Sequence, residues 1–293
     1  MTKLAVIGPG LLGGSIALAA RRAGNFHVSA WARRAEAVEE LSHRFADVAS
    51  TDLRKVATDA DIVVLCVPIG VMPALARELE QIIPQGAIVT DVGSVKAPVV
   101  AELAGIFRNR GTFIGSHPMA GSEQTGLKAA RKDLFDRAVC IVTPEASSSA
   151  AAIADITHFW ETLGCRVTQL SPEAHDEIVA EISHFPHLLA ALVVHDVEKR
   201  NPAAFDFIGP GFRDMTRIAG GPPEMWTEIL RVNRVAVKKS AEAMIEKLQE
   251  VLKLLDRSSP EGDFLMNEFL SQAKVRRDSL RLPATPGCHH PKP

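Results

Sequence analysis

One histidine in this chain lies in a setting suited to acid–base chemistry. His117 belongs to residues 115–123, Gly-Ser-His-Pro-Met-Ala-Gly-Ser-Glu, so glycines, a proline and small polar residues surround it. An imidazole changes its protonation state near neutral pH. A loop of this composition can hold it rigidly while leaving it open to a ligand, where it could accept the proton of a hydroxyl group. Taken alone, the segment could also be an ordinary polar turn.

A glycine-rich turn near the N-terminus predicts a dinucleotide site. Residues 8–13, Gly-Pro-Gly-Leu-Leu-Gly, follow an apolar segment over 3–7 and open a helical pattern over 11–23. Gly8 allows the tight turn, Gly10 lets a pyrophosphate approach the main chain, and Gly13 lets helix and strand pack closely. The free N–H groups of the helix start then bind the phosphates. The expected contacts of a nicotinamide dinucleotide are Gly8, Gly10, Leu11, Leu12, Gly13, Val67 and Pro68.

The end of the second expected strand indicates which cofactor is preferred. Sites selective for NAD carry Asp or Glu about 20 residues after the glycine turn to bind the ribose hydroxyls. Here the strand ends at Ala32 and is followed by Arg33 and Arg34. No carboxylate is placed to repel a 2′-phosphate, and two guanidinium groups can pair with it. We predict NADP over NAD; alternatively, both arginines simply lie on an exposed helix start.

The order of apolar segments predicts an α/β fold. Through residue 170, short apolar segments alternate with helical patterns, which is typical of a doubly wound parallel sheet covered on both faces. Expected strands are 3–7, 27–31, 61–67, 87–92, 112–114, 139–143 and 166–170, with helices such as 11–23, 71–83 and 96–108 between them.

After Ser171 and Pro172, an expected N-cap and first helical position, strand patterns stop. Long helical patterns follow over 173–199, 224–257 and 260–280. We therefore predict an NADP-binding Rossmann domain over 1–170, an all-helical substrate and dimerisation domain over 171–282, and a disordered tail over 283–293.

Composition and charge exclude several partners. The chain has 293 residues, 46% hydrophobic and 23% charged, with a net charge of −2, so neither nucleic acid nor an anionic membrane surface is expected as a partner. The uncharged segment 4–20 is broken by glycines, which argues against a signal peptide and for a cytoplasmic protein. Cys66, Cys140 and Cys165 are expected as reduced, buried thiols, and no metal site is expected, because their spacings match neither a metal site nor a redox pair. Cys288, His289 and His290 could bind a metal weakly, but a disordered tail is the favoured interpretation.

Four motifs in a fixed order resemble the prephenate and arogenate dehydrogenases of tyrosine biosynthesis. They are residues 90–96 (Thr-Asp-Val-Gly-Ser-Val-Lys), 115–123, 183–187 (Ser-His-Phe-Pro-His) and 211–219 (Gly-Phe-Arg-Asp-Met-Thr-Arg-Ile-Ala). The resemblance runs from residue 3 to about residue 280. It implies that a cyclohexadienol gives up a hydride to the nicotinamide and loses CO2 as its ring becomes aromatic. It also implies a homodimer formed by the C-terminal helices.

The resemblance implies roles for three residues. His117 would be the base for the ring hydroxyl, Ser94 would orient His117 and touch substrate and cofactor, and Arg217 would bind a substrate carboxylate. From the residues alone, Ser94 could be a helix N-cap and Arg217 a solvated helix position. Asp214 could hold Arg217 through an i,i+3 ion pair.

Two further histidines flank Pro186, which should kink or start a helix. His187 is expected to contact the substrate, whereas for His184 a core position is favoured over a substrate contact. Ser122 and Glu123 complete the expected substrate contacts. Glu123 could pair with the ammonium group of arogenate or with Arg217, and His187 could donate to a keto or carboxylate oxygen.

The interpretation favoured by these residues is an NADP-dependent prephenate dehydrogenase that forms 4-hydroxyphenylpyruvate. An arogenate dehydrogenase that forms tyrosine directly is the first alternative. A β-hydroxyacid dehydrogenase, which would use a lysine on the helical domain, and a non-catalytic NADP-binding protein are the others.

Overall fold

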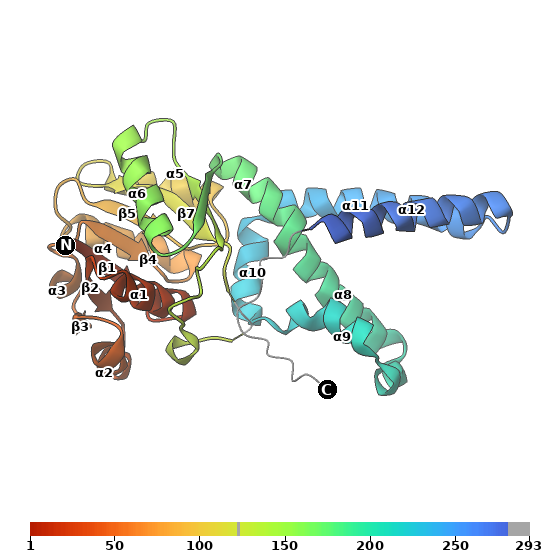
Figure 1. Ribbon diagram of the computed structural model, residues 1–293, viewed down its shortest axis with the longest axis horizontal. Coiled ribbons are helices and arrows are strands. Elements are labelled where there is room, and N and C mark those ends of the chain that lie inside the picture. Colours follow the sequence, from red (N-terminus) through yellow and green to blue (C-terminus); the bar gives the residue numbers. More distant parts are fainter. Residues whose placement is uncertain (122–123, 281–293) are drawn as a thin grey trace. The chain divides into compact units, whose positions relative to one another are not determined.

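The computed structural model describes residues 1–121 and 124–280. These residues form two compact units, Met1–Val237 and a second one that begins at Lys238 (Figure 1). Ser122, Glu123 and the tail 283–293, all subjects of predictions above, lie outside the described residues.

The first unit is built on a six-stranded parallel sheet with the strand order β3-β2-β1-β4-β5-β6. The chain leaves β1 on one side toward β2 and returns to β4 on the other, so the order reverses between β1 and β4. In such sheets ligands bind at the carboxyl end of this switch point. The strands are β1 (Thr2–Ile7), β2 (Phe26–Trp31), β3 (Val48–Ser50), β4 (Ile62–Leu65), β5 (Ile88–Asp91) and β6 (Thr112–Phe113).

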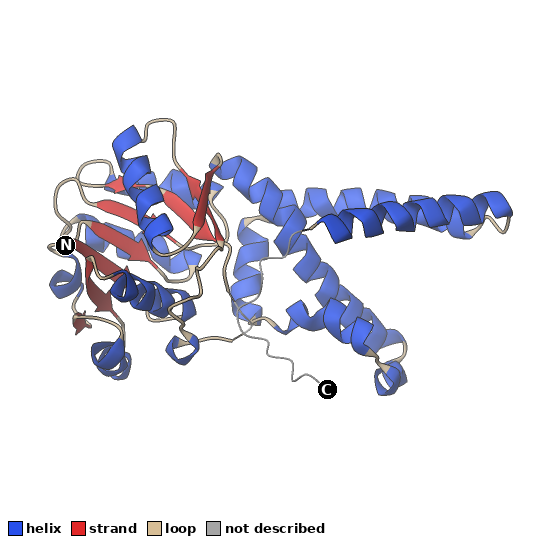
Figure 2. Cartoon of the chain, viewed as in Figure 1, coloured by secondary structure: helices blue, strands red, loops and turns tan. Residues whose placement is uncertain are grey.

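Helices cover both faces of this sheet, as Figure 2 shows. Alternate residues of β1 enter different cores: Leu4 and Val6 belong to one buried apolar cluster, and Ala5 and Ile7 belong to the other. Burial on both faces explains the continuously apolar strands. The predicted doubly wound sheet is therefore confirmed. The α-helices through residue 162 are α1 (Leu11–Ala23), α2 (Ala35–Arg44), α3 (Leu53–Ala57), α4 (Met72–Glu80), α5 (Ala97–Phe107) and α6 (Ala150–Thr162).

A second, three-stranded sheet corrects two predictions. It has the order β7-β8-β9, with β7 (Gly115–Pro118) antiparallel to β8 (Val139–Thr143) and β8 parallel to β9 (Arg166–Gln169). Residues 139–143 and 166–170 thus do not extend the main sheet. The segment around His117, expected as a loop, is a buried strand over its first four residues. Its polar residues hide the strand pattern, because their burial depends on hydrogen bonds to distant elements rather than on apolar alternation.

Helices form the rest of the described chain. They are α7 (Pro172–Val179), α8 (Phe185–Arg200), α9 (Pro210–Thr216), α10 (Pro223–Val232), α11 (Arg234–Leu255) and α12 (Pro260–Ser279), with short 3₁₀ turns that include η1 (Ile69–Val71) and η5 (Arg217–Gly220). Ser171 caps α7 as predicted, since its Oγ accepts a hydrogen bond from Ala174 N at 3.1 Å.

A single helix over 224–257 was expected, and this is wrong. Helix α10 ends at Val232 and α11 begins at Arg234. Asn233 has φ −95° and ψ 25°, outside the helical region, and its side-chain amide donates to the main-chain oxygen of Asp176 at 2.9 Å. The break is made by this tertiary hydrogen bond, which the apolar period cannot reveal.

A π-helical turn over Ala180–His184 joins α7 to α8. Pro186, at the start of α8, has no N–H group to donate to the preceding turn, so the α-helical hydrogen-bond ladder cannot run through this point. Such wide turns are frequent at functional sites. The predicted effect of Pro186 on the helix is confirmed, and the irregular turn carries His184.

Helices α7 and α8 together, Pro172–Arg200, are long and apolar enough to cross a membrane by length and composition alone. Yet His175 and Asp176, both buried, tie α7 to other elements of the first unit by hydrogen bonds. A helix packed in a folded unit passes the same compositional test.

Candidate active site

The glycine turn after β1 fits the pyrophosphate of a dinucleotide. Gly8 has φ +115°, and a Cβ on it would lie 2.4 Å from the main-chain oxygen of Cys66, so only glycine suits this position. A Cβ on Gly13 would lie 2.0 Å from the oxygen of Gly8, whereas one on Gly10 would meet no protein atom within 4 Å. The approach to Gly10 is therefore open, and α1 begins there without a side-chain cap or an acidic residue in its first turn. Its free N–H groups can bind phosphate.

Arg33 and Arg34 follow β2 directly and are exposed. The main-chain N–H of Gly8 donates to the oxygen of Trp31 at 3.1 Å, which joins the end of β2 to the glycine turn. Within 1–121 and 124–280, neither arginine forms an ion pair or a side-chain hydrogen bond. Both guanidinium groups thus remain available to an anionic ligand near this turn.

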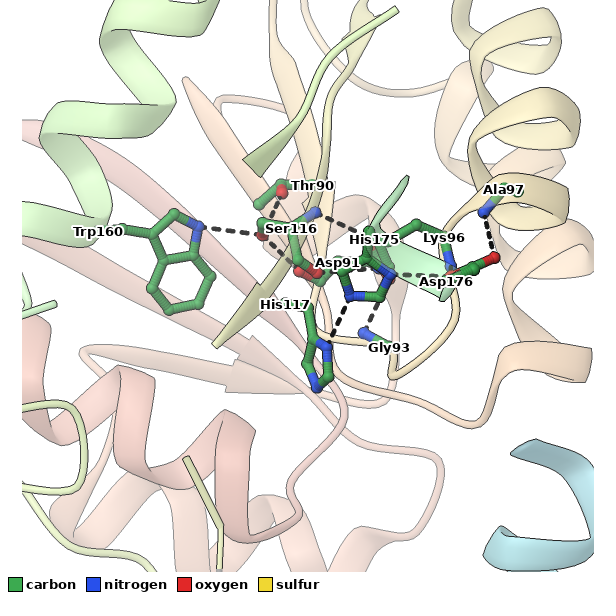
Figure 3. Close-up of polar contacts among 10 residues, drawn as sticks. All are labelled: Thr90, Asp91, Gly93, Lys96, Ala97, Ser116, His117, Trp160, His175 and Asp176. Atoms are coloured by element: carbon green, nitrogen blue, oxygen red, sulfur yellow. Dashed lines mark hydrogen bonds and ion pairs between the residues drawn. The ribbon is translucent and has the colours of Figure 1, made fainter. Parts of the chain in front are cut away.

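His117 ends a buried chain of three polar side chains (Figure 3). Its Nδ1 lies 2.9 Å from Nε2 of His175, and Nδ1 of His175 lies 2.8 Å from Oδ1 of Asp176. The other nitrogen of His117, Nε2, points away from His175 in Figure 3 and has no hydrogen-bond partner in the part of the chain that the structure describes. A ring that is held at one nitrogen and free at the other suits a proton acceptor.

The partner that orients His117 differs from the one expected. Ser94 is half-buried on the turn after β5, and no hydrogen bond joins it to His117 among the described residues. His175 and Asp176 hold His117 instead, and sequence reasoning missed both. Neighbouring polar residues at the start of a helix usually face solvent, so only the packing of α7 against α5 reveals them.

Ser116 anchors the strand that carries His117. Its Oγ donates to the main-chain oxygen of Asp91 at 2.6 Å and accepts from the indole of Trp160 at 3.0 Å. Because its single proton is used, Thr90 must donate in the 2.7 Å contact between the two hydroxyls. Lys96 Nζ donates to the oxygen of Ser116 at 2.9 Å. Every polar group of Ser116 is thus satisfied, which fixes the position of the next residue.

Burial shapes the acid–base properties of the site. It lowers the pKa of His117 well below its ordinary value, and the neighbouring His175 and Lys96 lower it further. Burial also lowers the pKa of His175 and Lys96, although Asp176 and Asp91, respectively, oppose the effect. Neutral imidazoles are therefore favoured at physiological pH, which is the form that can accept a proton.

His184 and His187 lie on either side of the proline and have different surroundings. Nδ1 of His184 lies 3.0 Å from the amide of Asn233, and burial lowers the pKa of His184 to about 4. His187 stacks on Trp226, with ring centres 3.5 Å apart and an interplanar angle of 16°. The His184 ring meets the edge of the same indole. Both histidines are therefore packed side chains, and sequence reasoning missed Trp226 and Asn233.

Arg217 and Asp214 are both exposed, and the expected ion pair between them is not present among the described residues. Helix α9 ends at Thr216 and the 3₁₀ turn η5 begins at Arg217, so the two residues do not share one helical face. Arg217 instead interacts with a group other than Asp214, so it is not without a partner.

A carboxylate from α10 binds the turn after β4, beyond Val67 and Pro68. Glu228 accepts hydrogen bonds from the main-chain N–H groups of Ile69 at 3.1 Å and Gly70 at 2.6 Å. The turn that is expected to contact the cofactor is thereby tied to the helical part of the first unit. Sequence reasoning gave no signal for this contact, because it joins residues more than 150 positions apart.

Taken together, the open glycine turn at the switch point of a doubly wound sheet and the buried histidine define a dehydrogenase that uses a nicotinamide dinucleotide. Comparisons with known proteins agree. The nucleotide-binding domain of prephenate dehydrogenase matches residues 16–169, and its dimerization domain matches residues 171–270. The chain belongs to the prephenate dehydrogenase family.

Individual relatives are similar over nearly the whole chain. The cyclohexadienyl dehydrogenase of Zymomonas mobilis is 31% identical, with 93% of this chain and 94% of that protein covered. The prephenate dehydrogenase of Bacillus subtilis is 32% identical over 94% of this chain and 75% of its own length. Among solved structures, prephenate dehydrogenase from Aquifex aeolicus with hydroxyphenyl propionate and NAD⁺ has a TM-score of 0.89 and 29% identity, covering 96% of this chain and 99% of that one.

Family membership settles the class of activity. The chain is an oxidoreductase with a Rossmann-type domain, so the β-hydroxyacid dehydrogenase and the non-catalytic binding protein are set aside as alternatives.

Proposed function

We propose that this enzyme oxidatively decarboxylates prephenate to 4-hydroxyphenylpyruvate, with NADP as the hydride acceptor. The observation that carries the proposal is His117, whose Nδ1 is held by His175 while its Nε2 has no partner among the described residues. The relative from Bacillus subtilis bears the name of this activity. The cyclohexadienyl dehydrogenase of Zymomonas mobilis keeps arogenate open as a second substrate.

A bound oxidised nicotinamide would supply the acceptor for the hydride of the ring carbon that bears the hydroxyl group. His117 Nε2 accepts the hydroxyl proton, which builds electron density on the oxygen and helps the hydride leave. The electron pair of the breaking bond to CO2 enters the ring, which becomes aromatic. His117 then returns the proton to the phenolate oxygen, so no net proton is released.

Substrate binding is assigned to residues around this histidine. Arg217 supplies a guanidinium for one carboxylate, and His187 donates to a keto or carboxylate oxygen. The remaining proposed substrate contacts are Ser122, Glu123, His184 and Asp214. Ser94 is proposed to contact substrate and cofactor from its turn after β5, next to the buried Val95 and Lys96.

The preference for NADP rests on the two exposed arginines after β2. Each guanidinium can donate to a 2′-phosphate. The family match by itself establishes only that the cofactor is a nicotinamide dinucleotide. Cofactor contacts are proposed at the glycine turn over 8–13 and at Val67 and Pro68.

A homodimer and a cytoplasmic location belong to the same proposal. The match to a dimerization domain supports the first, together with apolar side chains that are exposed in one chain. They lie on α11 and α12 of the second unit and are Met244, Ile245, Leu248, Leu252, Leu255, Phe264, Phe269, Leu270 and Val275. The division into domains over 1–170 and 171–282 is proposed with it.

One experiment tests the substrate and the cofactor together. The purified enzyme is given prephenate or arogenate, each with NADP or NAD, and formation of reduced cofactor is followed by absorbance. We expect the highest kcat/KM with prephenate and NADP. No turnover with any pair would contradict the proposed activity, and a higher kcat/KM with NAD would contradict the role of Arg33 and Arg34.

A further inference from the structure

The buried chain from His117 through His175 to Asp176 has a direction that can be derived from its donors and acceptors. Asp176 is the fixed point. Its Oδ1 accepts from the main-chain N–H of Lys96 at 2.7 Å, and its Oδ2 accepts from that of Ala97 at 2.9 Å. A carboxylate at the start of α5 is favourable, and an ionised carboxylate can only accept. The proton in its 2.8 Å contact with His175 must therefore lie on Nδ1 of the histidine.

The proton on His175 Nδ1 also determines the direction of the next hydrogen bond, between His175 and His117. His175 is fully buried and is favoured in its neutral form, so with Nδ1 protonated its Nε2 carries a lone pair. The 2.9 Å contact with His117 then requires His117 Nδ1 to be the donor. A neutral His117 with its proton on Nδ1 has a lone pair on Nε2, the nitrogen that faces away from the cluster.

We propose that Asp176, acting through His175, is a positioning residue that fixes the tautomer of His117, so that Nε2 is always the proton acceptor. The inference rests on the proposed role of His117 as the base. In the opposite tautomer Nε2 would carry a hydrogen and could not accept the hydroxyl proton. Asp176 does not touch the substrate; it determines which nitrogen of His117 can react.

The surrounding contacts hold the three side chains of His117, His175 and Asp176 in one arrangement. Asp176 is held at its side chain by the start of α5 and at its main-chain oxygen by the amide of Asn233. The His117 and His175 rings meet edge to face, with centres 5.1 Å apart. The titratable groups that face the two rings are Asp176, Lys96, Asp91 and His184, and Lys96 is paired with Asp91. No competing carboxylate contacts either ring among the described residues.

The tautomer can be read directly. Long-range ¹H–¹⁵N spectra of protein labelled with ¹⁵N-histidine distinguish a protonated from an unprotonated ring nitrogen, and the His117→Asn variant assigns the His117 signal by its loss. We expect a protonated Nδ1 and an unprotonated Nε2 at neutral pH. A His117 with its proton on Nε2 would overturn the inference, whether or not the enzyme turns over prephenate.

The Asp176→Asn variant tests the cause. The amide oxygen can still accept from the main-chain N–H of Ala97, and the amide nitrogen then faces His175 Nδ1 in place of Oδ1, so the acceptor for the N–H of Lys96 is lost. Donation from this nitrogen to His175 Nδ1 reverses the two histidine contacts and places the proton of His117 on Nε2. We expect a fall in kcat of about 10³- to 10⁴-fold, as the analogous change does in serine proteases. KM should change by less than about threefold, because carboxylate binding is untouched. Glu173→Gln, an equal charge change at an exposed residue of α7, is the matched control and should leave kcat unchanged.

A second pair of variants protects the test against misfolding. In His175→Gln the amide oxygen can accept from His117 Nδ1, so we expect kcat within about tenfold of the wild type; His175→Leu offers no acceptor and should match Asp176→Asn. Equal kcat values for His175→Gln and His175→Leu would refute the inference, and so would an unchanged tautomer signal in Asp176→Asn. In either case, turnover by the wild-type enzyme would still uphold the proposed function. Absence of wild-type turnover would refute the function and leave the spectrum to judge the tautomer.

Discussion

Lys96 and Asp91 form an ion pair in which neither side chain has any exposed surface. Both also bind Ser116, the residue before His117. Lys96 Nζ donates to the main-chain oxygen of Ser116 at 2.9 Å, and the main-chain N–H of Ser116 donates to Asp91 Oδ1 at 3.1 Å. The pair therefore holds the strand that carries the proposed base. Burial lowers the pKa of Lys96, and the neighbouring Asp91 opposes this effect.

Removing one member of this pair should be costly. Lys96→Met leaves the Asp91 carboxylate buried without its cation, and we expect the free energy of unfolding to fall by about 3–5 kcal/mol. Lys96→Met with Asp91→Asn should lose less, because no uncompensated charge remains. Urea unfolding followed by circular dichroism measures both. Lys247→Met, at an exposed ion pair with Glu250, is the control and should cost under about 1 kcal/mol.

Loss of the proposed base should affect turnover and not binding. His117→Asn removes an interaction that forms mainly in the transition state, so kcat should fall by about 10²- to 10⁴-fold with KM nearly unchanged. Steady-state kinetics with saturating cofactor provide the measurement. A comparable rise in KM at constant kcat would show that His117 binds substrate and does not act as the base.

The two arginines after β2 should decide between the cofactors. Arg33→Ala and Arg34→Ala each remove a possible charge-assisted bond to a 2′-phosphate, so the KM for NADP should rise by about 10- to 100-fold. The KM for NAD should change by less than about threefold. Arg44→Ala, at the far end of α2, serves as the control. Equal changes for both cofactors would exclude recognition of the 2′-phosphate.

Acid should destabilise the first unit through its buried histidines. Burial lowers the pKa of His117, His175, His184 and His187 in the folded protein, to about 4 for His184. Below about pH 6.5 the unfolded chain binds protons that the folded chain does not, so stability falls as the pH is lowered toward 4. Each such histidine contributes up to about 1.4 kcal/mol per pH unit.

Thermal unfolding between pH 7 and 5 checks this, with Tm expected to decrease steadily. His184→Gln should flatten the dependence of Tm on pH, even though it lowers Tm at pH 7 by breaking the contact with Asn233. A Tm that is constant over this range would contradict the prediction.

The second unit should lose its partner when a charge is placed on its apolar face. Leu248 is 52% exposed on α11 in the single chain. Leu248→Glu would bury a carboxylate in a dimer interface, so we expect monomers in light scattering coupled to size-exclusion chromatography. Gln249→Glu adds the same charge at the neighbouring exposed position and should leave the dimer intact. If the wild type is itself monomeric, the dimer proposal is wrong.

The sequence was sufficient for the main sheet and the glycine turn, because both depend on local patterns. Continuous apolar strands predict a sheet buried on two faces, and Gly8 and Gly13 are required by close main-chain contacts. The cap at Ser171 and the effect of Pro186 also follow from local chemistry.

The same reasoning failed where long-range contacts decide the structure. The break at Asn233 and the strand β7 depend on hydrogen bonds to residues far away in the chain. His175 and Asp176 resemble the solvated start of any helix, and only the tertiary structure brings them to His117. A resemblance to a family identifies a residue's expected role, here for Ser94, but not the neighbours that support His117.

The three tryptophans give this chain an optical property that follows from their positions. Trp31 ends β2, where its oxygen binds Gly8; Trp160 donates to Ser116; and Trp226 stacks on His187. The indoles of Trp160 and Trp226 thus lie beside two different parts of the proposed site, whereas the indole of Trp31 donates to the main-chain oxygen of Thr51 at 2.9 Å. The chain contains no tyrosine. Intrinsic fluorescence therefore comes from tryptophan without a tyrosine background. Single Trp→Phe replacements would let the emission separate events at the end of β2, at the strand that carries His117 and at His187.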